Sequence, residues 1–298
     1  MRVSGVTAPW QGQATYTPRS SRAALEDLFA GRSDLALVDF PALHPPRTVG
    51  RLLYQPLATY PVAVAVQLPQ APQLDLGQLC ALLLGEIRLW NDPKLAQAGG
   101  VRLPALPVLV ISRSDPNAAS FAVSQTCSTE SRNWRERIGV RSRWQAGASK
   151  LVSGLEAQRA ALALPGSLTV MLPSELPPGA QSARLRAVGG EYFGFERARF
   201  GFAVPRGLRE PWQGAVQLPS DPYAPLPAAN APDAYPLRGL LWGVALEQQK
   251  YRGRGRARAE ALRDLLRALR SGGVPEGLAP LPNLPLPGTF FYGAKPLP

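Results

Sequence analysis

The chain has 298 residues, of which 45% are hydrophobic and 18% charged, and its formal net charge is +12 at neutral pH. This length allows one large domain or two of medium size, and the composition excludes an intrinsically disordered chain. The positive charge permits an anionic solute, an anionic surface or nucleic acid as the partner, and does not choose among them. With a single histidine, His44, the chain is a poor candidate for a zinc site or a histidine-dependent catalytic triad.

Short apolar strands alternate with amphipathic helices along the chain, which predicts an α/β fold. Helices are expected over 21–30, 75–90, 116–127 and 154–164. A last, basic helix is expected where inward-packing leucines recur at helical spacing: Leu262, Leu265, Leu266 and Leu269. Strands are expected over 34–40, 60–68, 107–112, 167–171, 183–188, 200–204, 240–246 and 289–292. Ser20 or Ser21 is expected to cap the first helix. Asp115, which precedes Pro116, is expected to cap the third.

The two cysteines, Cys80 and Cys127, have no metal-ligand spacing and stand among apolar residues of predicted helices. We therefore expect two buried free thiols, with one disulfide bridge as the alternative if the protein is exported. The first residues lack the apolar core of a signal peptide, and no run reaches the roughly 18 apolar residues of a membrane span. The chain is expected to be soluble, either cytoplasmic or the mature part of an exported protein.

Three polar clusters stand where a strand ends or a helix begins: residues 18–21, Asp39 and residues 113–120. Helix N-termini present unpaired N–H groups and a partial positive charge, and ligands of open α/β sheets lie at the carboxyl ends of strands. These clusters therefore predict an anion site. The alternative is purely structural: the serines are simple caps, Asp39 is a surface carboxylate, and Arg113 and Asp115 form a local ion pair.

Several segments resemble, in order, those of the periplasmic phosphate-binding proteins of bacterial ABC transporters. They are YQPLATYPVAVAVQLP at 54–69, LDLGQLCALLLGEIRLWNDPKLAQ at 74–97, RSD at 113–115 and LPGSLTV at 164–170. The resemblance implies a two-lobed α/β fold of the periplasmic-binding-protein type, with crossover strands between the lobes. Lobe I would comprise 1–58 and 236–298, and lobe II 59–235. The ligand would lie in the cleft, which closes on binding.

The family's ligand motif, R-x-D-G-S-G-T, is partly kept in the second lobe. Arg113 and Asp115 match it, and the resemblance implies that Arg113 supplies positive charge to the ligand. Asn117, Ala118 and Ser120 would supply hydrogen-bond donors, from a side-chain amide, a backbone N–H and a hydroxyl. Ala119 stands where the family has threonine, so one hydroxyl donor is lost.

The first lobe would contribute Ser21, aligned with the family's ligand serine, and Asp39, aligned with its ligand aspartate. A carboxylate accepts the proton that phosphate carries near neutral pH and repels fully ionised sulfate, so Asp39 favours phosphate or arsenate. Thr7, with Trp10, is a weaker candidate, as the compressed remnant of a family loop. The family also has a long helix and another strand before its serine loop, whereas only about twenty residues precede Ser21 in this sequence. Either the sequence starts too late, or this lobe is naturally shortened.

The resemblance implies a solute-binding component of an ABC transporter that captures phosphate or a related oxyanion, works with a membrane permease and its ATPase, and is periplasmic or extracellular. A monomer is expected, with no metal, no organic cofactor, no nucleic acid and no enzymatic activity. The alternative is a non-transport relative whose pocket has decayed and which binds a protein or a surface. Nucleic-acid binding through the arginines of 252–270 is a third interpretation, and a solvated helix face explains them better.

Overall fold

The computed structural model describes residues 1–9, 11–41, 46, 50–95, 102–147, 149–197, 221–223, 234–271, 273–281 and 288–297. These residues form two compact units. The first contains the described parts of 1–60, 221–222 and 240–298, and the second those of 61–217, 223 and 234–239. Sheets and helices mix in both, which confirms the predicted α/β class. The lobe ranges predicted above, 1–58 with 236–298 and 59–235, stay a prediction.

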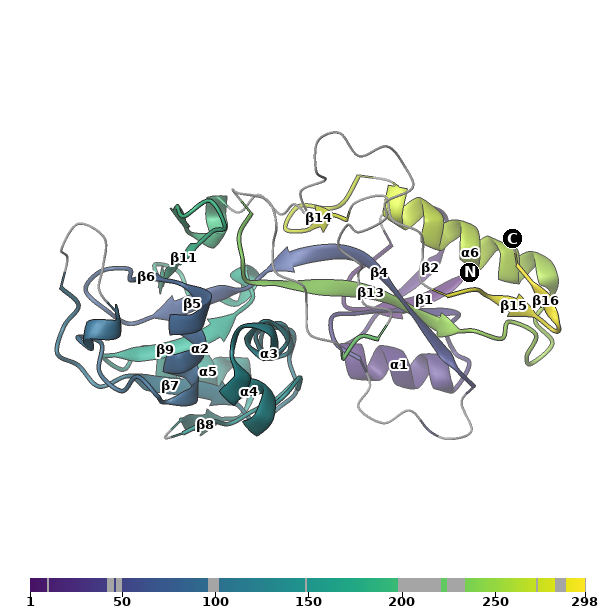
Figure 1. Ribbon diagram of the computed structural model, residues 1–298. Helices are drawn as coiled ribbons and strands as arrows, with labels where there is room; N and C mark the ends of the chain where they lie inside the picture. The colour runs from purple at the N-terminus through teal and green to yellow at the C-terminus, as the bar shows by residue number, and fades with distance from the viewer. Residues whose placement is uncertain are drawn as a thin grey trace. The chain divides into compact units, whose positions relative to one another are not determined.

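The first unit is built on a six-stranded sheet with the order β14-β4-β13-β3-β1-β2 (Figure 1). Its strands are β1 (Arg2–Gly5), β2 (Thr15–Pro18), β3 (Leu35–Val38), β4 (Leu52–Pro61), β13 (Arg238–Leu246) and β14 (Ala279–Pro280). A short hairpin of β15 (Phe291–Tyr292) and β16 (Lys295–Pro296) accompanies it. Because β1 pairs in parallel with both β2 and β3, the carboxyl ends of these three strands meet at one edge.

Two helices, α1 (Ser21–Phe29) and α6 (Arg256–Ser271), cover opposite faces of this sheet (Figure 1). Val3 of β1 belongs to the apolar cluster formed with α6, whereas the Ser4 hydroxyl donates to a backbone carbonyl of α1. Successive side chains of a strand point to opposite faces, so the two contacts place the helices on either side. The predicted inward-facing leucines of α6 are all buried: Leu262, Leu265, Leu266 and Leu269.

The second unit has a five-stranded sheet with the order β10-β5-β9-β7-β8. Its strands are β5 (Ala63–Val66), β7 (Leu109–Arg113), β8 (Lys150–Val152), β9 (Ser167–Met171) and β10 (Gln181–Ser182). A smaller sheet contains β6 (Gln73–Leu74), β11 (Arg184–Arg186) and β12 (Tyr192–Phe193). The helices are α2 (Leu76–Leu84), α3 (Ala118–Glu130), α4 (Arg132–Arg137) and α5 (Gly154–Leu162), with 3₁₀ turns η1 (Pro93–Leu95), η3 (Pro173–Glu175) and η4 (Phe195–Arg197). β7 runs parallel to β8 and β9.

Two helix boundaries differ from the sequence-based prediction. Helix α2 begins as predicted at Asp75, whose side chain accepts from the backbone N–H of Gln78 at 2.7 Å, but it ends at Gly85 rather than near residue 90. Gly85 adopts the left-handed conformation, with φ of 73°, that commonly ends a helix. Helix α3 is capped by Asn117, so the cap predicted at Asp115 is wrong.

Cys80 and Cys127 form a disulfide that joins α2 to α3, with 5.6 Å between their Cα atoms. The expectation of two free thiols is therefore wrong, and the alternative holds. The two residues are 47 positions apart, and only the packing of α2 against α3 brings them together.

None of the helices in the described part of the chain is long and apolar enough to span a membrane. The expectations for Trp10, for His44 and for a strand over 200–204 fall outside the described residues.

Candidate functional site

The carboxyl edge of β1, β2 and β3 brings together three of the predicted residues of the first unit. Ser20 caps α1 by accepting from the backbone N–H of Ala23, so Ser21 occupies the first helical position. Asp39 follows β3 directly. The Ser21 hydroxyl donates to the Asp39 carboxylate and accepts from the Asp39 backbone N–H at 3.0 Å. Thr7 follows β1 at the same edge, where its hydroxyl donates to the carbonyl of Ala8 at 3.4 Å.

The predicted residues of the second unit gather where β7 ends and α3 begins. Asn117 caps α3: its side-chain carbonyl accepts from the backbone N–H of Ser120 at 2.8 Å, and its amide donates to the Asp115 carbonyl at 3.1 Å. The backbone N–H groups of Ala118 and Ala119, in the first turn, donate no hydrogen bond to any described residue. They are the unpaired donors that a helix N-terminus offers to an anion.

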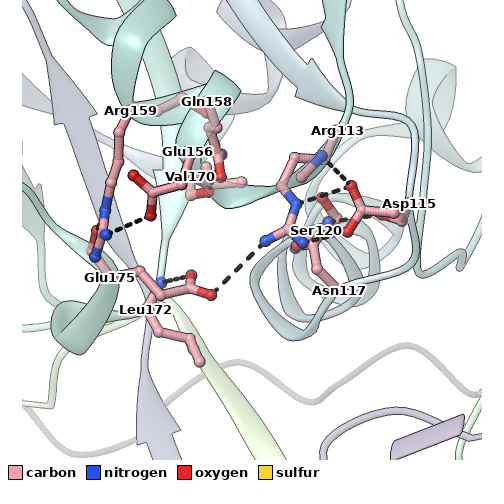
Figure 2. A network of polar contacts seen from close by, with 12 residues as sticks. Arg113, Asp115, Asn117, Ser120, Glu156, Gln158, Arg159, Val170, Leu172 and Glu175 are labelled. Carbon is pink, nitrogen blue, oxygen red and sulfur yellow. Dashed lines mark hydrogen bonds and ion pairs between the residues drawn. The ribbon is translucent and has the colours of Figure 1, made fainter. Parts of the chain in front are cut away.

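Arg113, the last residue of β7, supplies the positive charge beside this helix terminus (Figure 2). Its Nε donates to one oxygen of Asp115 at 3.2 Å, and its Nη2 pairs with the other. The third nitrogen, Nη1, lies 3.7 Å from Oε1 of Glu175. Only 12% of the arginine side chain is exposed. The local ion pair of the structural alternative therefore forms, and it holds the guanidinium in place while Nη1 keeps no hydrogen bond to a described residue.

Asp115 is ionised in this setting. Burial raises the pKa of its carboxyl, but the hydrogen bonds from Arg113 and from the backbone N–H of Gly154, at 2.8 Å, outweigh this, so the pKa lies below its usual value. A carboxylate with these partners has little capacity left for a ligand. The bidentate pair with Asp115 fixes the plane of the Arg113 guanidinium.

Sequence reasoning missed Gly154 and Glu175. Gly154 has a φ of 80°, in the left-handed region that favours glycine, and its N–H contacts Asp115 from the start of α5. Glu175 closes the turn η3 after β9. Both reach Arg113 or Asp115 from distant segments through the pairing of β7 with β8 and β9. A glycine directly after a serine and before a helix was the one local signal, and it indicated only a helix start.

Unpaired N–H groups at a helix N-terminus, next to an arginine fixed by ion pairs at the end of a parallel strand, are typical of α/β proteins that bind anions. The model of the PBP superfamily domain matches residues 11–264, and the chain belongs to this superfamily. The predicted family resemblance is thereby confirmed.

Known relatives agree with this assignment. The phosphate-binding protein PstS of Pasteurella multocida is 30% identical over 112 residues, which are 34% of this chain and 33% of that protein. PstS of Haemophilus influenzae is 29% identical over 112 residues, which are 34% of each chain. The match therefore spans about a third of the length of these curated relatives.

Solved structures extend the similarity to nearly the whole chain. A phosphate-binding protein from Stenotrophomonas maltophilia has a TM-score of 0.56 at 15% identity and covers 93% of this chain and 85% of its own. A DING protein has a TM-score of 0.58 at 14% identity, and the match covers 95% of this chain and 91% of that protein. At such identities the similarity shows the fold alone. That Ser21 and Asp39 serve the same ligand as Arg113 and the α3 terminus stays a prediction.

Proposed function

We propose that this protein is the solute-binding component of an ABC transporter and that it captures phosphate or a related tetrahedral oxyanion. The observation that carries the proposal is the α3 terminus, where the N–H groups of Ala118 and Ala119 have no partner among the described residues and Arg113 stands beside them. Backbone donors and a guanidinium together match the oxygens of a phosphate group. The PstS relatives named above are phosphate-binding proteins, which supports the same ligand.

Asp39 favours phosphate or arsenate over sulfate within this proposal. Its carboxylate is held by Ser21 and can accept a hydrogen bond from a protonated ligand. Phosphate carries such a proton near neutral pH, and sulfate does not. A buried or half-buried carboxylate repels an anion that has no proton to donate to it.

Binding is expected to be weaker than in relatives that keep a hydroxyl at the position of Ala119. A lost hydrogen bond to a charged group costs about 1.5–3 kcal/mol, which is on the order of ten- to a hundredfold in affinity. The two N–H donors and the arginine remain, so we expect binding to be weakened and not abolished.

The remaining roles follow from the family. We propose a binding protein without catalytic activity, which acts as a monomer with a membrane permease and its ATPase. The Cys80–Cys127 disulfide supports a periplasmic or extracellular location, since disulfides persist mainly in oxidising compartments.

The proposal is tested by calorimetric titration of phosphate-stripped protein with phosphate, arsenate and sulfate. We expect saturable binding of the first two, and loss of binding in Arg113→Met. Arg141→Met, whose Nε contacts only the carbonyl of Ile138 at an exposed position, is the control and should bind normally. Absence of heat with every anion, from protein with native circular dichroism, would overturn the proposal.

A further inference from the structure

The Glu175 carboxylate lies beside Arg113, and one of its two oxygens accepts no hydrogen bond from a described residue (Figure 2). Its Oε2 accepts from the backbone N–H of Leu172 at 2.9 Å, which fixes the side chain across the turn η3. Among the described residues, its Oε1 has only the 3.7 Å ion pair with Nη1 of Arg113, which is longer than a hydrogen bond. Oε1 therefore keeps lone pairs that a ligand bound at Arg113 can reach.

The charges around Glu175 leave this half of the site negative. From β7 and the residues after it come Arg113 and Asp115, and from α5 come Arg159 and Glu156. The Nε of Arg159 donates to the backbone carbonyl of Glu175 at 2.8 Å, and its Nη1 pairs with Glu156 at 2.8 Å. Arg159 thus holds the turn and is itself paired, so Arg113 is the cation that balances both Asp115 and Glu175.

A single guanidinium between two carboxylates does not suit a doubly charged anion. A dianion at Nη1 gains the attraction of Arg113 and meets the repulsion of Glu175, whose Oε1 lies 3.7 Å from that nitrogen. A singly charged oxyanion meets less repulsion. When it also carries a proton, it can donate that proton in a hydrogen bond to Oε1.

We propose, on the basis of the function proposed above, that Glu175 is a specificity-determining residue that selects the more protonated, singly charged form of the oxyanion. It competes with the ligand for Nη1 of Arg113 and accepts the ligand's hydroxyl. Phosphate is then bound better as the monoanion than as the dianion, and sulfate, which has no proton to donate, is rejected.

The test compares wild type, Glu175→Gln and Glu156→Gln by calorimetry, with phosphate at pH 6 and pH 8 and with sulfate at pH 8. Glutamine keeps an acceptor for the Leu172 N–H and removes the charge. We expect Glu175→Gln to bind phosphate on the order of tenfold more tightly than wild type at pH 8, with a smaller gain at pH 6, and to gain measurable sulfate binding. Glu156→Gln removes a charge from the same network at an exposed position without touching Arg113, and should match wild type.

Each outcome separates this inference from the function itself. Equal or weaker phosphate binding by Glu175→Gln, with wild type still binding, overturns the role of Glu175 and leaves the phosphate function standing. Binding by Glu175→Gln alone supports the role of Glu175 and overturns phosphate capture by wild type. Absence of binding by all three folded proteins overturns both.

Discussion

The Ser21 hydroxyl and Asp39 form two hydrogen bonds with each other: the hydroxyl donates to the carboxylate and accepts from the Asp39 backbone N–H at 3.0 Å. The hydroxyl of Tyr60 also donates to the Asp39 carbonyl, at 3.2 Å. Ser21 is 1% exposed, so it cannot turn freely toward solvent. Within the proposed function, we therefore expect this serine to act on the ligand through Asp39, whose position it fixes.

Ser21→Ala should weaken phosphate binding by about tenfold or more, because the half-buried Asp39 loses both the acceptor of its backbone N–H and the donor to its carboxylate. Ser20→Ala is the matched control on the adjacent residue. It removes the cap of α1, which should lower the free energy of unfolding by about 1 kcal/mol without changing affinity. Calorimetry and urea unfolding of both variants check this. Unchanged affinity in Ser21→Ala would refute the proposed part of Ser21 in the site.

Asn117→Asp separates helix capping from anion binding at the start of α3. Aspartate caps a helix as well as asparagine, and its charge suits a helix N-terminus. The same charge beside the N–H groups of Ala118 and Ala119 should repel an oxyanion. We expect phosphate affinity to fall at least about a hundredfold. The melting temperature should fall only modestly, because the cap is kept and the amide hydrogen bond to the Asp115 carbonyl is lost.

Asn117→Ser is the control for this prediction, since it keeps a capping oxygen and adds no charge. Its affinity should fall less than that of Asn117→Asp. Equal affinities in the two variants would mean that the α3 terminus does not contact the anion.

Much of the fold could be predicted from apolar periodicity. The strand over 167–171 and the leucine face of α6 were predicted with their correct residues. Strands β1 and β2 were missed, because their residues, RVSG and TYTP, contain no apolar run like the LALV of β3. Whether Cys80 and Cys127 are bridged could not be decided from the sequence either, since this depends on how two helices pack.

The site was predictable only where its groups are local in sequence or matched a family motif. Arg113 and Asp115 are two residues apart, and a motif indicated them. Ser21 and Asp39 meet because parallel strands end at one edge, which the strand order decides. Glu175 reaches Arg113 from the turn after β9. No local pattern at residue 175 indicates that contact.

Reduction of the Cys80–Cys127 disulfide should lower the free energy of unfolding by about 2–5 kcal/mol, since the bridge closes a long loop of the unfolded chain. Phosphate affinity should change little, because Cys127 lies near the far end of α3 from Ala118. Thermal unfolding with and without dithiothreitol measures the first effect, and calorimetry under the same conditions the second. The variant carrying alanine at both positions is the control, and its stability should not respond to reductant.

Asp34, just before β3, is the centre of a buried charge cluster at the amino end of that strand. Its carboxylate accepts from Arg254 at 2.6 Å, from Arg258 at 2.7 Å and from the backbone N–H of Arg2 at 2.8 Å. Burial raises the pKa of Asp34, but these donors outweigh it and the pKa is lowered overall. A carboxyl whose pKa is lower in the folded state stabilises the fold above its unfolded pKa, and that contribution is lost as the pH falls through the folded value.

Asp34→Asn should therefore destabilise the protein by about 3–5 kcal/mol at neutral pH, because Arg254, only 4% exposed, is left as an unpaired buried charge. The same variant should lose less stability than wild type on acidification below about pH 4, the range in which an unfolded aspartate titrates. Urea unfolding at pH 7, 4 and 3 measures both effects. Glu260→Gln, which breaks an exposed pair on α6, should cost less than about 1 kcal/mol and keep the wild-type pH profile. Parallel pH profiles for Asp34→Asn and wild type would show that Asp34 does not carry the acid sensitivity of the first unit.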